Sequence, residues 1–369
     1  MTKKVIIIVS SLILLCLLFA MLGYYNHDAI GDFLDSESWL SKEPFSSSIS
    51  QEIKESTGGN YLATYTSDGI KFYDYNGNLT RTVALSSTKA KLYSKDAYVV
   101  VLTEDTNTIY LYKDNALLWQ EKINNSIKNI SVSKNGYVSV CFSPSGYKSG
   151  IAIYDQNGKN ILSTYLASTY AVDTAVSNNG KIVYIAEINT SGIKPQSYIR
   201  TIDLLSSSDS NKEVSYQKFA SDEIVTDIEV TNQDVLLALT DIAIYSFDGE
   251  QPTKVCEFSE QNTLYATITN LENPCVIEQT VSKTISDSTI IKKYTEEPCE
   301  SMLAGVPQTV ATSNDKIAIG IGSEVLVLNK DLKPVAKCVV SDNVTNIAFI
   351  KNTSTLALIY KTKIEFIKL

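Results

Sequence analysis

Residues 133–158 read SKNGYVSVCFSPSGYKSGIAIYDQNG and carry the clearest structural signal in the chain. A Ser-led polar turn at 133–136 precedes an apolar strand at 137–143. A loop follows, then a second strand from Ile151 that ends in a turn at Gly158. Alternating β-branched and aromatic residues between Asn, Asp and Gly clusters are typical of antiparallel hairpins. The stretch therefore predicts two neighbouring strands of one sheet.

Both halves of this stretch recur along the chain. The Ser- or Thr-led turn recurs, each time before an apolar strand, at 94–96, 177–180, 231–234 and 313–315. The strand that ends in an Asp-, Asn- or Gly-rich turn recurs from Ile70, Ile109, Ile242 and Val325. A four-stranded unit repeated at about 40 residues is typical of a β-propeller blade.

Eight such units are predicted, and they lie near 49–85, 90–123, 127–168, 170–221, 224–260, 263–305, 306–341 and 343–369. The last unit offers only three strands. Because a closed ring leaves no exposed sheet edge, the fourth is expected from the amino end, within residues 40–56. The predicted fold class is all-β, an eight-bladed propeller. Seven blades are the alternative, and stacked β-sandwiches are a further rival.

The strand and turn at Ile151–Gly158 resemble the repeats of quinoprotein-like and WD40-like propellers. Trp119 matches the Leu-Trp pair that ends a quinoprotein-type blade. The layout as a whole is similar to an uncharacterised family of bacterial single-pass membrane proteins with an exported propeller. The WD40 Gly-His and Trp-Asp dipeptides do not occur, so the resemblance implies the fold, and we expect no cofactor.

Residues Val5–Tyr24 form an uncharged apolar run, preceded by Lys3 and Lys4. As a helix of about 30 Å, such a run matches the thickness of a bilayer core. The positive-inside rule then places residues 1–4 in the cytoplasm and the rest of the chain outside the membrane. An uncleaved anchor at 5–24 is favoured over a cleaved signal peptide and a buried core helix. Residues 25–48 are interpreted as a stalk, and 49–369 as the extracytoplasmic propeller.

Composition excludes several classes of function. The formal charge is −9, and nucleic-acid binders need a basic face. His27 is the single histidine, which argues against Ser-His-Asp and Cys-His catalysis and against His-rich metal sites in the folded region. No P-loop or CxxC pattern occurs, so neither a catalytic set nor a metal site is predicted. Among the six cysteines, Cys275 and Cys299 are the one pair for which a disulfide is considered.

Uneven loops single out one candidate binding surface. If the strands of a blade are called A to D from the axis outward, the A–B turns are uniformly short and the B–C loops differ greatly. Long B–C loops are expected at 143–150, 189–198 and 282–288. Loops diverge where binding surfaces are built on a rigid scaffold. The first two are neighbours and contribute the candidate partner-binding residues Tyr147, Lys148, Lys194, Gln196 and Tyr198.

These features favour a membrane-anchored module that binds an envelope protein or a cell-wall polymer, or that serves as a scaffold. The alternative is a carboxylate-dependent enzyme acting on a saccharide or cell-wall substrate, which needs paired acids near the axis. A purely structural envelope component is a third hypothesis. The expected location is the cell membrane, with the carboxyl-terminal domain extracytoplasmic.

Overall fold

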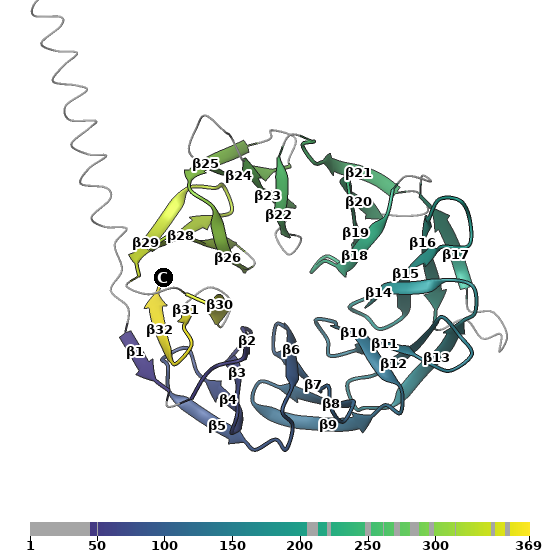
Figure 1. Ribbon diagram of the computed structural model, residues 1–369, viewed down its shortest axis with the longest axis horizontal. Coiled ribbons are helices and arrows are strands. Elements are labelled where there is room, and N and C mark those ends of the chain that lie inside the picture. The colour runs from purple at the N-terminus through teal and green to yellow at the C-terminus, as the bar shows by residue number, and fades with distance from the viewer. Residues whose placement is uncertain are drawn as a thin grey trace, which may run out of the picture.

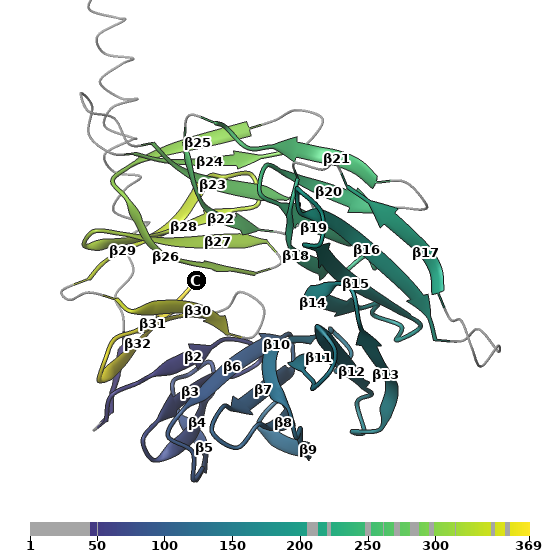
Figure 2. The same ribbon diagram turned by 45° about the vertical axis from the view of Figure 1, so that its right-hand side comes forward.

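The computed structural model describes residues 45–49, 51–204, 213–219, 223–247, 252–260, 262–268, 274–280, 288–294, 299–313, 315–340, 344–350 and 355–369. These residues form eight four-stranded antiparallel sheets arranged as blades around a central axis (Figure 1). A view turned by 45° shows the same sheets following one another around the ring (Figure 2). The prediction of an all-β, eight-bladed propeller is confirmed.

Within each blade the strands follow one another from the innermost, A, to the outermost, D. Blades 1 to 4 are built from β2 (Glu55–Thr57), β3 (Leu62–Thr66), β4 (Gly69–Tyr73) and β5 (Leu79–Val83); β6 (Ala90–Lys95), β7 (Tyr98–Thr103), β8 (Thr108–Lys113) and β9 (Ala116–Lys122); β10 (Ser126–Val132), β11 (Val138–Ser143), β12 (Ser149–Tyr154) and β13 (Asn160–Leu166); β14 (Tyr170–Val176), β15 (Ile182–Asn189), β16 (Gln196–Asp203) and β17 (Glu213–Lys218). Blades 5 to 8 are built from β18 (Val225–Val230), β19 (Leu236–Thr240), β20 (Ala243–Phe247) and β21 (Pro252–Glu257); β22 (Thr263–Ile268), β23 (Cys275–Thr280), β24 (Ser288–Lys293) and β25 (Cys299–Ala304); β26 (Pro307–Thr312), β27 (Lys316–Ile321), β28 (Glu324–Asn329) and β29 (Pro334–Val339); β30 (Asn346–Ile350), β31 (Thr355–Ile359), β32 (Lys363–Lys368) and β1 (Phe45–Ser48).

The two ends of the propeller meet in blade 8. Strand β1 pairs antiparallel with β32, with Phe45 opposite Phe366. Their rings stack with centroids 5.4 Å apart. The expectation that residues 40–56 supply the missing strand is confirmed. The propeller consequently includes residues 45–48, which the sequence alone assigns to the stalk, because those residues complete the last sheet.

The recurring turn residues do equivalent jobs in successive blades. In the A–B turns, the hydroxyls of Ser133, Ser177 and Thr231 accept hydrogen bonds from backbone N–H groups four residues later. In the C–D turns, Asp74 and Asp155 accept from the N–H groups two and four residues later. Such side chains stabilise a reversal locally, which is why the turns recur so clearly in the sequence.

The core consists of one apolar cluster at each of the eight junctions between successive blades. At the junction of blades 2 and 3, Val100 of β7 and Val140 of β11 belong to one such cluster, and neither is exposed. Every residue of β7 is buried, because both faces of the sheet are covered by neighbouring blades. Two-sided burial therefore explains the continuous apolar runs of the inner strands.

Two expectations lie wholly or partly beyond the described residues. The predicted anchor at 5–24 is outside them, and within them no helix is both long and apolar enough to cross a bilayer. Cys275 and Cys299, the pair considered for a disulfide, lie on β23 and β25, with β24 between them. Strands two apart are separated by about 10 Å, beyond the reach of a disulfide. Cys275 is buried.

Because β1 closes the ring, truncating its residue Phe45 is expected to destabilise the protein. Phe45→Ala removes the ring that stacks on Phe366, and we expect it to lower the free energy of unfolding by about 2 kcal/mol. The control is Leu79→Ala, because Leu79 is 52% exposed on the outermost strand of blade 1 and does not take part in ring closure. Equilibrium urea unfolding measures both, and equal losses in the two variants would contradict the closing role of β1.

Candidate functional site

The ring has two faces that differ in character. Antiparallel order places all A–B and C–D turns on one face, which we call the A–B face. The B–C loops and the connections between blades lie on the other, which we call the B–C face. Tyr147 and Lys148 lie between β11 and β12, and Lys194 lies between β15 and β16. The candidate residues from the two neighbouring loops therefore occupy the B–C face of blades 3 and 4.

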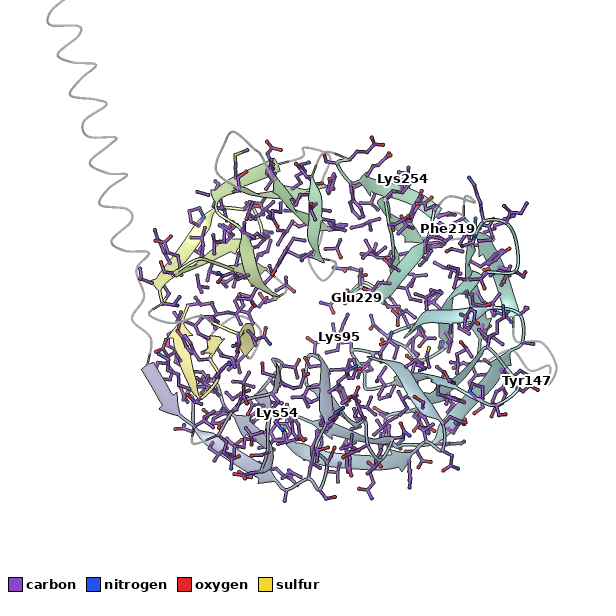
Figure 3. All side chains as sticks on the ribbon, in the orientation of Figure 1. Lys54, Lys95, Tyr147, Phe219, Glu229 and Lys254 are labelled. Carbon is purple, nitrogen blue, oxygen red and sulfur yellow. The ribbon has the colours of Figure 1, made fainter. Side chains whose placement is uncertain are left out.

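Tyr147 projects from the rim of blade 3 (Figure 3). It packs on Tyr165 of β13, with ring centroids 5.1 Å apart. Tyr165 in turn meets the edge of Phe142, which belongs to the apolar cluster between blades 2 and 3. The ammonium of Lys148 lies 4.9 Å from the ring centroid of Tyr170, the first residue of blade 4. The B–C loop of blade 3 thus contacts one aromatic ring of its own blade, Tyr165, and one of blade 4, Tyr170.

Tyr198 belongs to a second aromatic pair. It stacks on Tyr216 of β17 with centroids 4.8 Å apart, and the guanidinium of Arg200 lies 5.4 Å from the Tyr216 ring. Arg200 donates to the fully buried Glu187 through Nε at 2.5 Å, and Thr169 donates to the same carboxylate at 2.5 Å. A buried, fully partnered carboxylate therefore fixes the arginine that lies against the exposed ring.

Two of the predicted site residues have other placements than expected. Gln196 and Tyr198 belong to β16 rather than to a loop, because the hairpin pairs as far as Asn189 opposite Gln196. Gln196 donates to the carbonyl of Phe219 at 2.5 Å, which ties β16 to the connection between blades 4 and 5. Lys194 lies exposed in the loop, beside the fully exposed Ile193. Of the long B–C loop predicted at 282–288, only Ser288 lies among the described residues.

Most of the aromatic residues at this surface were missed by the sequence-based prediction. Five of the described tyrosines are exposed, and four of them lie here: Tyr147, Tyr165, Tyr170 and Tyr216, at 49%, 50%, 45% and 42%. Tyrosines in strands are ordinarily interior or packed between blades. The sequence contains one indication that Tyr165 and Tyr170 are exposed, because these two residues flank the short connection between two blades. We call these four residues with Tyr198, Lys148 and Arg200 the aromatic patch.

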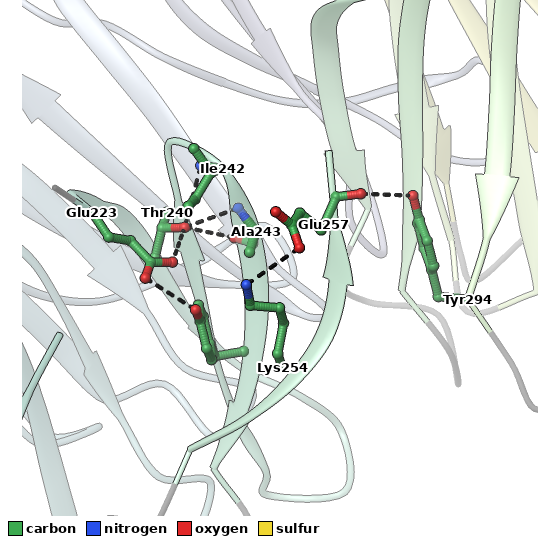
Figure 4. Close-up of polar contacts among 8 residues, drawn as sticks. Glu223, Thr240, Ile242, Ala243, Lys254, Glu257 and Tyr294 are labelled. Carbon is green, nitrogen blue, oxygen red and sulfur yellow. Dashed lines mark hydrogen bonds and ion pairs between the residues drawn. The ribbon is translucent and has the colours of Figure 1, made fainter. Parts of the chain in front are cut away.

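Buried acids at the B–C ends of other blades have structural partners. Glu223 accepts hydrogen bonds from Thr240 at 2.8 Å and from Tyr245 at 3.0 Å, and so secures the two-residue B–C turn of blade 5 (Figure 4). Glu278 accepts from Asn262 and from Lys292, both at 2.8 Å. Each acid is satisfied by its own blade or its connection, so these carboxylates stabilise the hairpins that carry the face.

The axis of the ring is hollow and polar. A pocket of about 450 Å³ opens toward the A–B face, and a smaller hollow of about 280 Å³ lies along the inner strands of blades 2 to 5. Lys95 of blade 2 and Glu229 of blade 5 border both spaces, and their side chains point into the channel (Figure 3). They form an ion pair across it. The channel therefore has a charged constriction between its two parts.

Two aspartates form a pair in the smaller hollow. Register shifts in the A strands of three successive blades occur at equivalent places, immediately before Asn129, Asp173 and Asp227. Asn129 donates to Asp173 Oδ1 at 2.6 Å, and the backbone N–H of Ile228 donates to Asp173 Oδ2 at 3.1 Å. The carboxyl groups of Asp173 and Asp227 are neighbours, and each influences the pKa of the other.

Burial raises the pKa of Asp173 well above the usual range, and the neighbouring Asp227 carboxyl raises it further. The pKa of Asp227 is also raised, mainly because the channel wall removes it from bulk solvent. Asp227 is exposed to the solvent in the channel. Because protein surrounds this solvent, it stabilises a second negative charge beside Asp173 less than bulk water would.

The saccharide-enzyme hypothesis requires acids near the axis, and this pair lies there. Retaining and inverting glycosidases separate their carboxyl groups by about 5–10 Å so that a sugar and a nucleophile fit between them. Asp173 and Asp227 instead lie next to each other, and Asp173 accepts hydrogen bonds from Asn129 of blade 3 and from the backbone N–H of Ile228 in blade 5. The arrangement is that of a link between blades, so it does not favour glycoside hydrolysis.

Comparisons with known proteins agree with this fold. A family model described as a family of unknown function, DUF5711, matches residues 37–369. No curated protein matches the chain. Similar solved structures include the C-terminal WD40 domain of Sif2, with a TM-score of 0.60, 13% identity, and coverage of 89% of this chain and 99% of that one. BamB from Moraxella catarrhalis has a TM-score of 0.53 and 15% identity, with coverage of 89% and 100%.

A third similar structure is the dihydro-heme d1 dehydrogenase NirN in complex with DHE. Its TM-score is 0.53 and its identity 11%, with coverage of 84% of this chain and 73% of that one. At identities this low, the similarity shows the propeller fold that these structures share and nothing about ligands.

The paired aspartates predict an unusual dependence of stability on pH. Because the pKa of Asp173 is raised in the folded protein, its contribution is complete below about pH 4 and is lost as the pH rises through the raised pKa. Asp227→Asn removes the neighbouring carboxyl that raises the pKa of Asp173 and leaves the hydrogen bonds that Asp173 accepts intact, so we expect it to exceed the wild type by about 1–2 kcal/mol at pH 8 and to approach it at pH 4. Urea unfolding across this range measures the difference. Asp331→Asn, on an exposed turn, is the control, and parallel curves for Asp227→Asn and wild type would contradict the coupling of the two acids.

Proposed function

We propose a binding role for this chain, which belongs to the DUF5711 family of unknown function. It acts as a membrane-anchored, extracytoplasmic propeller that binds another protein of the cell envelope through the B–C face of blades 3 and 4. The observation that carries this proposal is the aromatic patch, where four tyrosines remain exposed and ordered by ring contacts.

The chemistry of the patch suits a protein partner. Tyrosine and arginine are enriched at the centres of protein interfaces, where each buries a large area and also forms polar contacts. Here Tyr216 is already stacked on Tyr198 and held against Arg200, and Arg200 is fixed by buried Glu187. The rings are thus preorganised, which reduces the entropy that binding must overcome.

The charges of the patch indicate what kind of surface the partner presents. The chain as a whole is acidic, with a formal charge of −9, whereas the patch contributes Lys148 and Arg200 and lies beside Lys194. A partner segment with apolar side chains flanked by acids would complement these groups and would be repelled from most of the remaining surface. A protein segment meets this description more readily than a neutral cell-wall glycan.

The membrane location is supported by the sequence. The uncharged run at 5–24 follows two lysines, and the described ring begins at Phe45 in the outermost strand of blade 8. Residues 25–44, if extended, reach about 70 Å, enough for the propeller to meet a partner away from the bilayer surface. The tether would join the ring at its rim, which leaves both faces accessible.

The experiment places a photoreactive amino acid at position 147 or 79 of the full-length chain in its native cell. Position 147 lies in the aromatic patch, and Leu79 is equally exposed beside a C–D turn on the opposite face. We expect an adduct with one envelope protein from position 147 and none from position 79. Adducts from both positions, or adducts with glycan strands alone, would contradict the proposal.

A second measurement follows once the adduct partner is known. The triple variant Tyr147→Ser, Tyr165→Ser and Tyr170→Ser is expected to weaken its affinity for the full-length chain at least 30-fold, since exposed aromatic anchors dominate such interfaces. Leu79→Ser, Leu117→Ser and Leu118→Ser together form the matched control, because they remove exposed apolar groups elsewhere. Unchanged affinity in the tyrosine variant, with an unchanged thermal midpoint, would show that the patch is not the interface.

A further inference from the structure

The junction between blades 6 and 7 is incompletely filled. A pocket of about 680 Å³ lies there, within the range of small-molecule sites, which are mostly apolar. Its described wall includes Leu303 of β25, Val306 of the connection between the blades, and Ile319, Ile321 and Leu326 of β27 and β28. Blade 5 separates this pocket from the aromatic patch of blades 3 and 4, so the two are distinct sites.

The junction between blades 2 and 3 shows what is missing. In blade 3, the pair next to the B–C loop is Phe142 and Gly150, and the Phe142 ring belongs to the apolar cluster of that junction with 6% of its surface exposed. A Cβ atom added to Gly150 would overlap this ring, so the ring occupies the space over the glycine. The equivalent pair in blade 7 is Ile321 and Glu324. Ile321 is smaller than phenylalanine and only half-buried, and Glu324 is exposed, so no ring closes this junction.

Two glycines border the pocket at the B–C face. Gly305, in the connection between the blades, has φ of 102°, and a Cβ atom there would lie 2.6 Å from Cγ2 of Ile321. Its carbonyl accepts a hydrogen bond from the Thr289 hydroxyl at 2.8 Å, which fixes the connection to blade 6. Gly322 lies in the B–C turn of blade 7, where a Cβ atom would meet nothing within 4 Å. Neither glycine places a side chain over the pocket, so this end stays open.

The pocket is a slot that follows one face of blade 7. It extends from Glu324 of β28 to Pro334 of β29, which lies opposite Leu328. The four-residue step from Glu324 to Leu328 along a strand corresponds to about 13 Å. Packed sheets stand about 10 Å apart, so the slot is too narrow for an α-helix, which is about 10–12 Å wide with its side chains. An extended peptide would leave backbone N–H and C=O groups unpaired against apolar side chains. The slot therefore suits a hydrocarbon chain.

The charged side chains of the described lining neutralise each other. Glu324 and Lys337 form an ion pair at 3.0 Å, with 48% and 32% of their side chains exposed. Gln308 and Ser323 are also exposed at the edge of the slot, and both side chains can donate and accept hydrogen bonds. Since the edge carries no net charge, it complements a ligand whose polar end is uncharged.

We propose that this slot binds the unbranched acyl chain of a neutral lipid, whose uncharged polar end lies at the B–C face beside Gln308 and Ser323. The chain packs against Leu303, Ile321 and Leu326 and takes the place that a phenylalanine ring fills between blades 2 and 3. The membrane anchor predicted at 5–24 would keep the propeller close to a supply of acyl lipids. The site does not depend on the protein partner of the aromatic patch.

The test is calorimetric titration of the full-length chain, held in an amphipathic polymer in place of detergent, with monohexanoylglycerol, monooctanoylglycerol and monodecanoylglycerol. We expect saturable binding whose affinity rises about 15-fold for every two methylenes added, because each buried methylene strengthens binding by a similar factor. The glycerol ester of adamantane-1-carboxylic acid has the same head group on a compact apolar body that cannot extend along the slot. It should bind at least tenfold more weakly than monodecanoylglycerol.

Variants that fill the slot make the result decisive. Ile321→Phe introduces the residue found at the equivalent place in blade 3, and should weaken the binding of monodecanoylglycerol tenfold or more without lowering the thermal midpoint of the free protein. Ile242→Phe is the matched control, because Ile242 is 41% exposed in the B–C turn of blade 5, and should leave the affinity unchanged. Ala304→Trp blocks the slot from an exposed position and replaces Ile321→Phe if that variant does not fold.

Four results would each overturn the proposal. They are the absence of saturable binding, an affinity that does not depend on chain length, and equal affinities in the wild type and a folded slot-filling variant. The fourth is binding of octanoate at least tenfold tighter than binding of monooctanoylglycerol, which would identify an anion site at Lys337 instead.

Discussion

The structure depends on a single constraint, which is that a four-stranded sheet with apolar residues on both faces cannot hide them from water by itself. Each blade covers one face of the next, and eight apolar clusters at eight junctions complete the burial only if the first and last blades also meet. Strand β1 makes that closure by pairing with β32, so residues from opposite ends of the chain share one sheet. Every other feature, including the rigid faces and the hollow axis, follows from the closed ring.

Closure brings the inner strands together, and their polar side chains have to be satisfied there. The register shifts in β10, β14 and β18 place Asn129, Asp173 and Asp227 at equivalent heights around the axis, where they bond from blade to blade. On the other side of the ring, Asn346 of blade 8 donates to Ser56 of blade 1 at 2.9 Å. The axis is consequently lined by polar groups, whereas the junctions between blades are apolar. Charged groups such as Lys95 and Glu229 can therefore lie at the axis with a modest cost in free energy.

The same ring separates two kinds of surface. The B–C face has loops of unequal length over blades 3 and 4, and ring stacking orders its exposed tyrosines. The A–B turns that the structure describes are two to five residues long, and those near the axis border a polar pocket. The two faces of the ring are thus chemically different, and a change at the rim need not alter the axis.

Local sequence was sufficient for the repeat, the blade count and the position of the closing strand. Turn residues such as Ser133 and Asp155 act on their own backbone within four residues, and alternation within a strand needs no distant partner. Local sequence also located the long loop that carries Tyr147 and Lys148. It could not show that Gln196 bonds to Phe219, that Tyr198 stacks on Tyr216, or that Asp173 meets Asp227 and Lys95 meets Glu229. Those contacts join different strands of one blade or different blades, up to 134 residues apart in the chain, so only the pairing of strands and the packing of blades around the ring bring them within reach of each other.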